Sequence, residues 1–157
     1  MATWHEIRAE APALMDAGDR LISPNGDGIA FLATVRPDGG PRVHPVAPVL
    51  AGGRLHVFIV NLSPKYQDLL RDGRFAMHAL PTPAGGEEFY FTGRARECHL
   101  PERRAEVTAA SGNRLGHLEF EVLFELDIRR VLHTVWSGWG TPKVWPEYRR
   151  WPSRPNA

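Results

Sequence analysis

The chain has 157 residues, of which 43% are hydrophobic and 24% are charged, and its formal net charge is +1. This length is typical of one domain with a single core, and the near-neutral charge gives no reason to expect nucleic acid or an anionic membrane as a partner. The one cysteine, Cys98, excludes an intrachain disulfide and no apolar run is long enough to span a bilayer, so we expect a cytoplasmic protein.

Two helices are predicted near the N-terminus. Thr3 and Glu6 have the spacing of a capping box, in which a hydroxyl is followed three residues later by a carboxylate, so a helix should begin there. Pro12 favours a break just before it and a second helix that runs from Pro12 towards Leu21. The glycine-containing stretch 23–28 lacks the Lys-Ser/Thr of a phosphate-binding loop, and we interpret it as a connector.

The next part of the chain predicts an antiparallel meander. Its extended runs are 29–36, 42–50 and 54–61, and its turns are 37–40 and 51–53. Proline fixes φ and glycine supplies positive φ in these turns, so two successive hairpins are expected. Pro45 and Pro48 cannot donate hydrogen bonds to a neighbouring strand, so the second run should be interrupted or lie at a sheet margin.

A short helix is predicted from Pro64 to Arg71, with Ser63 at its N-cap and Gly73 as its stop. The N-terminus of a helix presents free N–H groups and a partial positive charge. Together with the Ser63 hydroxyl and the Lys65 ammonium, it would form a small anion site suited to a phosphate. The alternative is that Ser63 only caps the helix and that Lys65 is only solvated.

The second half of the chain predicts further strands and one helix. The expected elements are strands at 74–80, 87–98, 118–127 and 131–136, a loop at 81–86, and a helix at 101–110 that is ended by 111–113. Gly93 should mark a bulge or a close approach of two strands. In 118–127 the apolar residues alternate with acidic ones, and we interpret the acidic set as a solvated face rather than a metal site.

Three segments together, ATVRPDGGPRVHPV, LHVFIVNLSPK and RDGRFAMHAL, resemble the flavin-binding split-barrel family typified by pyridoxamine 5′-phosphate oxidase. The resemblance covers residues 29–100 well and the last third more loosely. It implies a mainly β fold, an antiparallel split β-barrel with flanking helices, in a single domain over 1–157. It also implies a homodimer with FMN bound in clefts between the subunits.

The resemblance assigns cofactor-binding roles by position. It places His44, Pro45 and Val46 beside the flavin ring and ribityl chain, Phe58 and Ile59 along the flavin, Ser63 and Lys65 at its phosphate, Glu88 near the ring, and Trp136 and Trp139 against the flavin of the second subunit. His44 stands where the family has a stronger base, and Pro64 replaces a residue that is commonly basic, so positive charge at the phosphate is reduced. The alternative for His44 is a half-buried side chain bonded to backbone.

The C-terminal arm, about 136–157, is rich in aromatic residues. It contains Trp136, Trp139, Trp145, Tyr148 and Trp151. A monomer should not expose so much aromatic surface, so we expect the arm to pack on a partner subunit. From Trp145 onward, plain dimer packing is the alternative to a cofactor contact.

The leading hypothesis for function is an FMN-dependent oxidoreductase that acts on an unknown small organic substrate. The C-terminal Arg/His-rich substrate motif of the oxidase is not found, so we do not expect pyridoxamine phosphate as the substrate. The alternatives are a deazaflavin-dependent reductase, a non-catalytic flavin- or haem-binding carrier or sensor, and a structural dimer whose ligand site has decayed. No catalytic residue is assigned because hydride transfer by a flavin requires no acid or base from the protein, and no metal site is predicted.

Overall fold

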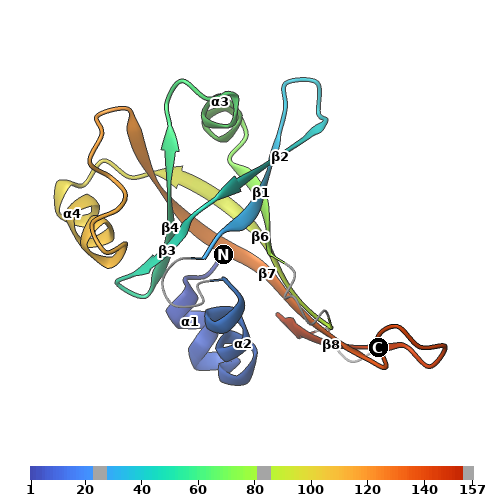
Figure 1. The fold of residues 1–157 in the computed structure, drawn as a ribbon. Coiled ribbons are helices and arrows are strands. Elements are labelled where there is room, and N and C mark those ends of the chain that lie inside the picture. Colours follow the sequence, from blue (N-terminus) through green and yellow to red (C-terminus); the bar gives the residue numbers. More distant parts are fainter. Residues whose placement is uncertain (23–27, 81–85, 154–157) are drawn as a thin grey trace.

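The structure, a computed structural model, describes residues 1–22, 28–80 and 86–153. Its elements are α1 (Trp4–Glu10), α2 (Pro12–Ile22), β1 (Ala30–Val35), β2 (Pro41–Val46), β3 (Pro48–Ala51), β4 (Arg54–Val60), α3 (Pro64–Arg71), β5 (Arg74–Ala79), β6 (Glu87–Glu97), α4 (Pro101–Ala110), β7 (Glu121–Ser137) and β8 (Trp145–Trp151). The strands form one curled antiparallel sheet in the order β2-β1-β5-β6-β7-β4-β3, with β8 added to β7 (Figure 1). The predicted mainly β fold with flanking helices is confirmed.

The helix boundaries follow the local sequence signals. The Thr3 hydroxyl accepts a hydrogen bond from the Glu6 backbone N–H at 3.1 Å, and the Glu6 carboxylate accepts one from the Thr3 N–H at 2.7 Å. The chain then breaks at Ala11, and α2 begins at Pro12. The two proposed connectors lie almost wholly outside the described residues, at 23–27 and 81–85.

The main core lies between the concave side of the sheet and α1 with α2. The Trp4 ring centroid is 6.0 Å from those of both Phe89 and Phe91. Gly18 of α2 allows this packing, since a Cβ there would lie 2.6 Å from the Phe89 ring. Burial of such aromatic side chains is the main source of stability in a domain of this size.

A smaller apolar cluster lies beneath α4. It contains Val49, Ala51, Val107 and Leu123, with Phe58 packed against it. The Arg104 guanidinium lies over the Phe58 ring, 5.3 Å from its centroid. Helix α4 thus covers the side of β3 and β4 that faces away from the main core.

The run 42–50 is interrupted, as its prolines predicted. It forms β2 and β3, with Ala47 between them. The last two predicted strands, in contrast, form one continuous strand, β7, so their division was wrong. The register between β6 and β7 shifts between Thr92 and Gly93, and Arg129 is the extra residue of this bulge. With Arg129 accommodated in the bulge, β7 continues through the gap expected at 128–130.

Two expectations about the strand predicted at 118–127, in which apolar residues should point inward and acidic ones outward, are corrected. Leu118 and Phe120 were expected to point inward, but they precede β7 and are 50% and 43% exposed. The Glu121 carboxylate accepts the Leu118 N–H at 3.0 Å, which holds this segment in a turn.

The acidic face of β7 is also less solvated than expected. Asp127 is buried, and Glu125 is half-buried. Arg54 reaches Glu125 at 2.5 Å from β4, and Arg96 reaches Asp127 at 2.7 Å from β6. Strand pairing on both sides of β7 supplies these cations, which the alternation of a single segment cannot reveal.

The aromatic arm is a β-hairpin that extends from the body of the molecule (Figure 1). Its second strand, β8, pairs antiparallel with the end of β7 and was not predicted. Trp151 packs against the main core, and its Nε1 donates a 2.7 Å hydrogen bond to Glu10. Trp139 and Trp145, near the tip, are 61% and 71% exposed. None of the described helices is long and apolar enough to cross a membrane.

Candidate functional site

The side of the sheet that faces away from α1 and α2 carries a continuous row of side chains. Strand register aligns the members of this outer row, which are Pro45, Phe31, His78, Tyr90, Leu132 and Arg150. Paired residues of antiparallel strands share a face, so all six point to the same side. Phe31 is 39% exposed, and its neighbour Val43 on β2 is 58% exposed. The face is therefore an apolar and aromatic surface open to a ligand or a second subunit.

His78 lies at the centre of the outer row with its tautomer fixed. Its Nδ1 is 2.6 Å from the carbonyl oxygen of Ala79, which can only accept, so Nδ1 carries the proton. In the neutral imidazole Nε2 then presents a lone pair that can bind a metal. The Tyr90 ring lies beside the imidazole, with the centroids 6.4 Å apart.

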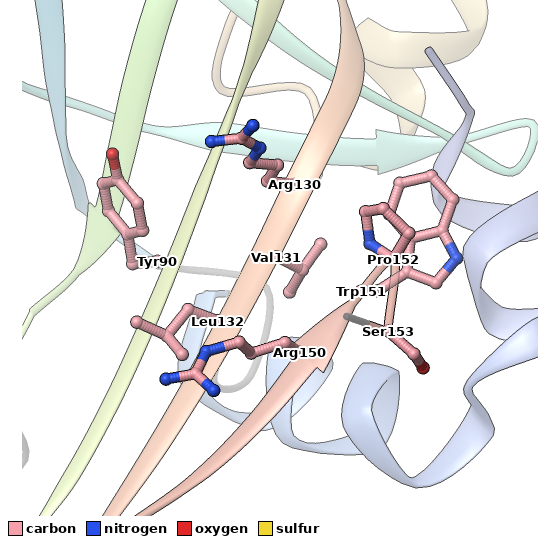
Figure 2. A pocket seen from close by; sticks show the side chains of 8 residues that line it. All are labelled: Tyr90, Arg130, Val131, Leu132, Arg150, Trp151, Pro152 and Ser153. Carbon is pink, nitrogen blue, oxygen red and sulfur yellow. The ribbon is translucent and has the colours of Figure 1, made fainter. Parts of the chain in front are cut away.

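A pocket of about 480 Å³ lies at the β8 end of the outer row. Figure 2 shows Tyr90, Arg130, Leu132 and Arg150 on one side of the strands, while Trp151 projects to the other. The Arg150 guanidinium also lies 4.7 Å from the centroid of the Tyr148 ring, which orients it. The pocket combines an apolar floor with two cations.

A second polar site lies where β4 meets α3. Ser63 occupies the N-cap position, but its hydroxyl donates to the Val60 carbonyl at 2.6 Å and makes no capping bond. Lys65 in the first turn is half-buried, and burial lowers the pKa of its ammonium, while no charged group in the described ranges acts on it. The Asn61 Oδ1 is buried and has no hydrogen-bond partner among the described residues. We call Asn61, Ser63 and Lys65 the β4–α3 junction.

Asp68 fixes α3 against the sheet. Its carboxylate accepts hydrogen bonds from Arg42 Nε at 2.8 Å and from the Thr34 hydroxyl at 2.9 Å, and Arg71 is 3.4 Å away. Burial disfavours the charged carboxylate, but these partners outweigh burial and lower the pKa of Asp68. The charge of Arg42 is thereby neutralised, which leaves Lys65 as the cation at the N-terminus of α3.

The predicted residues of β2 divide between its two faces. His44 is half-buried and opposite Leu32, so it points towards the core side. Pro45 is exposed in the outer row, and Val46 is buried in the main core. Strand alternation thus separates His44 from the surface that Pro45 helps to form.

The predicted residues of β4 are largely occupied by protein contacts. Ile59 is fully buried in the main core, and one side of the half-buried Phe58 ring is covered by Arg104. Both residues support the barrel next to the β4–α3 junction.

The predicted residues of β6 and the arm lie at the other end of the sheet. Glu88 is half-buried and opposite Thr134. The Trp136 and Trp139 rings meet edge to face, with their centroids 5.8 Å apart. The Trp136 Nε1 is buried without a hydrogen-bond partner in the part of the chain that the structure describes. The structure therefore brings Trp136 and Trp139 into contact in the arm, and it places Ser63 and Lys65 together at the start of α3. The two pairs lie on different elements.

Several residues of both sites were missed from the sequence. They are Asn61, His78, Tyr90, Arg130 and Arg150. Asn61, His78 and Tyr90 lie in predicted strands, whereas Arg130 lies between two predicted strands and Arg150 lies on β8, which was not predicted. Only the register between β5, β6, β7 and β8 shows that four of them share one face.

The comparisons with known proteins identify a fold. No family model and no curated protein matches the chain. A NimC/NimA family protein from Clostridium acetobutylicum has 16% identity and a TM-score of 0.65, over 93% of this chain and 99% of that one. HutZ, the haem storage protein from Vibrio cholerae, has 18% identity and a TM-score of 0.60, over 76% of this chain and 89% of that one.

A haem-binding protein from Mycobacterium smegmatis has 18% identity and a TM-score of 0.63, over 85% of this chain. The chain spans only 57% of that mycobacterial protein. At these identities the likeness concerns the fold alone. The protein therefore has the antiparallel split-barrel fold with flanking helices, as the sequence predicted.

Proposed function

We propose that this protein is a homodimeric split-barrel oxidoreductase that binds FMN and acts on a small organic substrate. The observation that carries the proposal is the β4–α3 junction. A half-buried Lys65 without a charged partner among the described residues, at the start of a helix whose N-cap side chain is turned away, favours a bound phosphate. The unsatisfied Asn61 oxygen nearby suits a hydroxyl donor such as those of the ribityl chain.

The chemistry expected of this protein comes from the cofactor. A bound flavin supplies hydride transfer, while the protein supplies binding and orientation. In this proposal Lys65 and the first turn of α3 hold the phosphate, and Asp68 keeps that turn in place through Arg42. The exposed indoles of the arm belong to the contact between the two subunits.

The first test is the absorption spectrum of the purified protein, alone and during titration with FMN. Lys65→Ala should weaken FMN binding at least tenfold, since a charge-assisted hydrogen bond is worth about 1.5–3 kcal/mol. Gln67→Ala, an exposed position on the same helix, is the matched control and should leave the affinity unchanged. A protein that takes up no FMN in excess would overturn the proposal. The same titration with a deazaflavin coenzyme tests the deazaflavin-reductase alternative.

The second candidate is a haem-binding carrier or sensor, and it rests on a different residue. In its neutral form His78 presents the Nε2 lone pair on the outer row, with Tyr90 beside it. Imidazole and phenolate are both common axial ligands of haem iron. Two of the proteins similar in fold are described as haem-binding or haem storage proteins.

Titration with haemin separates the two candidates. If haem binds here, a Soret band should develop, and His78→Ala should remove or shift it while Lys65→Ala leaves it unchanged. His99→Ala is the control, because the His99 side chain is 79% exposed. A Soret band that His78→Ala does not alter would exclude this ligand.

A further inference from the structure

The pocket at the β8 end of the outer row is positively charged. Arg130 and Arg150 line it, and none of its lining residues is acidic. Neither guanidinium forms an ion pair within the described part of the chain. The pocket thus presents two cations that form no ion pair with any of the described side chains.

The two arginines are held close together by strand pairing. Leu132 is opposite Arg150, and Arg130 precedes Leu132 by two residues on β7. The Cα atoms of such diagonal positions are about 7–8 Å apart, so the two arginine side chains start from neighbouring positions on one face of the sheet. The Tyr148 ring orients Arg150, which keeps this guanidinium at the pocket.

The remaining walls are apolar and planar. Leu132 and the half-buried Tyr90 lie on the same side of the strands as the two arginines, while Trp151 projects to the other side (Figure 2). The volume of about 480 Å³ is within the range of small-molecule sites. Arginine recognises carboxylate and phosphate by paired hydrogen bonds, and aromatic walls favour a flat apolar body.

We propose that this pocket binds a small molecule that carries a carboxylate or phosphate group on a planar apolar ring. The site is distinct from the β4–α3 junction, while it shares Tyr90 with the outer row on which the haem candidate rests.

The test is calorimetric titration of the full-length protein with three ligands of matched shape. Naphthalene-2-carboxylate and 2-naphthyl phosphate carry the anion, and naphthalene-2-carboxamide is neutral. At least one anion should bind ten times more tightly than the amide, and the tighter of the two identifies the recognised group. Equal affinity for all three ligands would overturn the proposal.

Variants assign the binding to the pocket. Arg130→Gln combined with Arg150→Gln should weaken anion binding at least tenfold and leave amide binding unchanged. Arg129→Gln is the matched control, because Arg129 is an exposed neighbour of equal charge that does not line the pocket. Retention of anion binding by the double variant would also overturn the proposal. Lys65→Ala should leave this binding unchanged, so failure here and failure of FMN binding are distinguishable.

Discussion

Asp68 joins three parts of the fold through one buried carboxylate. It is 2% exposed and bonds to Thr34 on β1 and Arg42 on β2. A buried carboxylate is stable only when its partners are in place, because its removal from water is costly. The orientation of α3, and hence of the β4–α3 junction, depends on this network.

Asp68→Asn should therefore destabilise the protein by about 3 kcal/mol, since breaking a buried ion pair leaves the Arg42 charge uncompensated. Urea denaturation measures the change. Asp38→Asn is the control, because the Asp38 side chain is 60% exposed and its pair with Arg36 should contribute less than about 1 kcal/mol. Equal losses in the two variants would show that Asp68 is not the structural anchor.

His56 should make the stability depend on pH. It is fully buried beside Glu125 and Arg103, and burial is the main cause of its lowered pKa. In the unfolded chain the histidine pKa is near 6.5, so below about pH 6.5 the unfolded state binds more protons than the folded state. The free energy of unfolding should then fall as pH decreases from 6.5 towards the lower, folded-state pKa.

The measurement is denaturation between pH 7.5 and 5. His56→Gln should reduce the slope of the free energy of unfolding against pH, by an amount that corresponds to at most one bound proton. His99→Gln, at an exposed position, should leave the slope unchanged. Some slope will remain because burial also lowers the pKa of His133. An unchanged slope in His56→Gln would contradict the prediction.

At the scale of elements, local sequence signals were sufficient for most boundaries. The capping box at Thr3 and the proline that begins α2 predicted both helix starts, and Pro64 to Arg71 matched α3. Contacts between two strands cannot be predicted from the sequence of one segment. The ion pairs of Glu125 and Asp127 and the existence of β8 both depend on a neighbouring strand, so the sequence could not show them.

The same limit applies to the candidate sites. Ser63 and Lys65 were predicted because capping and charge lie within one short segment. The outer row required the register of strands far apart in sequence. Arg130 and Arg150 become neighbours only because β8 folds back on β7.

The β6–β7 bulge gives a prediction for an element as a whole. A Cβ at Gly93 would lie 1.8 Å from the Asp127 carbonyl oxygen, so Gly93→Ala must separate the two strands. We expect a loss of about 3 kcal/mol, as for overpacking in a core. Gly39→Ala is the control: its φ is +82° and no atom lies within 4 Å, so only the backbone conformation costs free energy, about 1 kcal/mol. Similar melting temperatures for the two variants would contradict the prediction.

At the scale of the molecule, the arm projects from the main core and exposes aromatic side chains near its tip. Trp151 anchors the base of the hairpin to the main core, while Trp139 and Trp145 near the tip remain exposed. Exposed aromatic side chains on a projecting element are typical of subunit contacts, where tryptophan contributes much of the binding energy. The arm is thus anchored at its base and exposed at its tip, as the proposed homodimer requires.

Trp139→Ser combined with Trp145→Ser should therefore weaken the proposed homodimer without loss of the fold. Each buried indole at the centre of an interface contributes about 2 kcal/mol or more, so the dimer dissociation constant should rise at least a hundredfold. Sedimentation velocity over a concentration series measures it. Leu100→Ser, which removes a 55% exposed side chain outside the arm, should leave association unchanged. If the parent protein sediments as a monomer at all concentrations, the arm serves another partner.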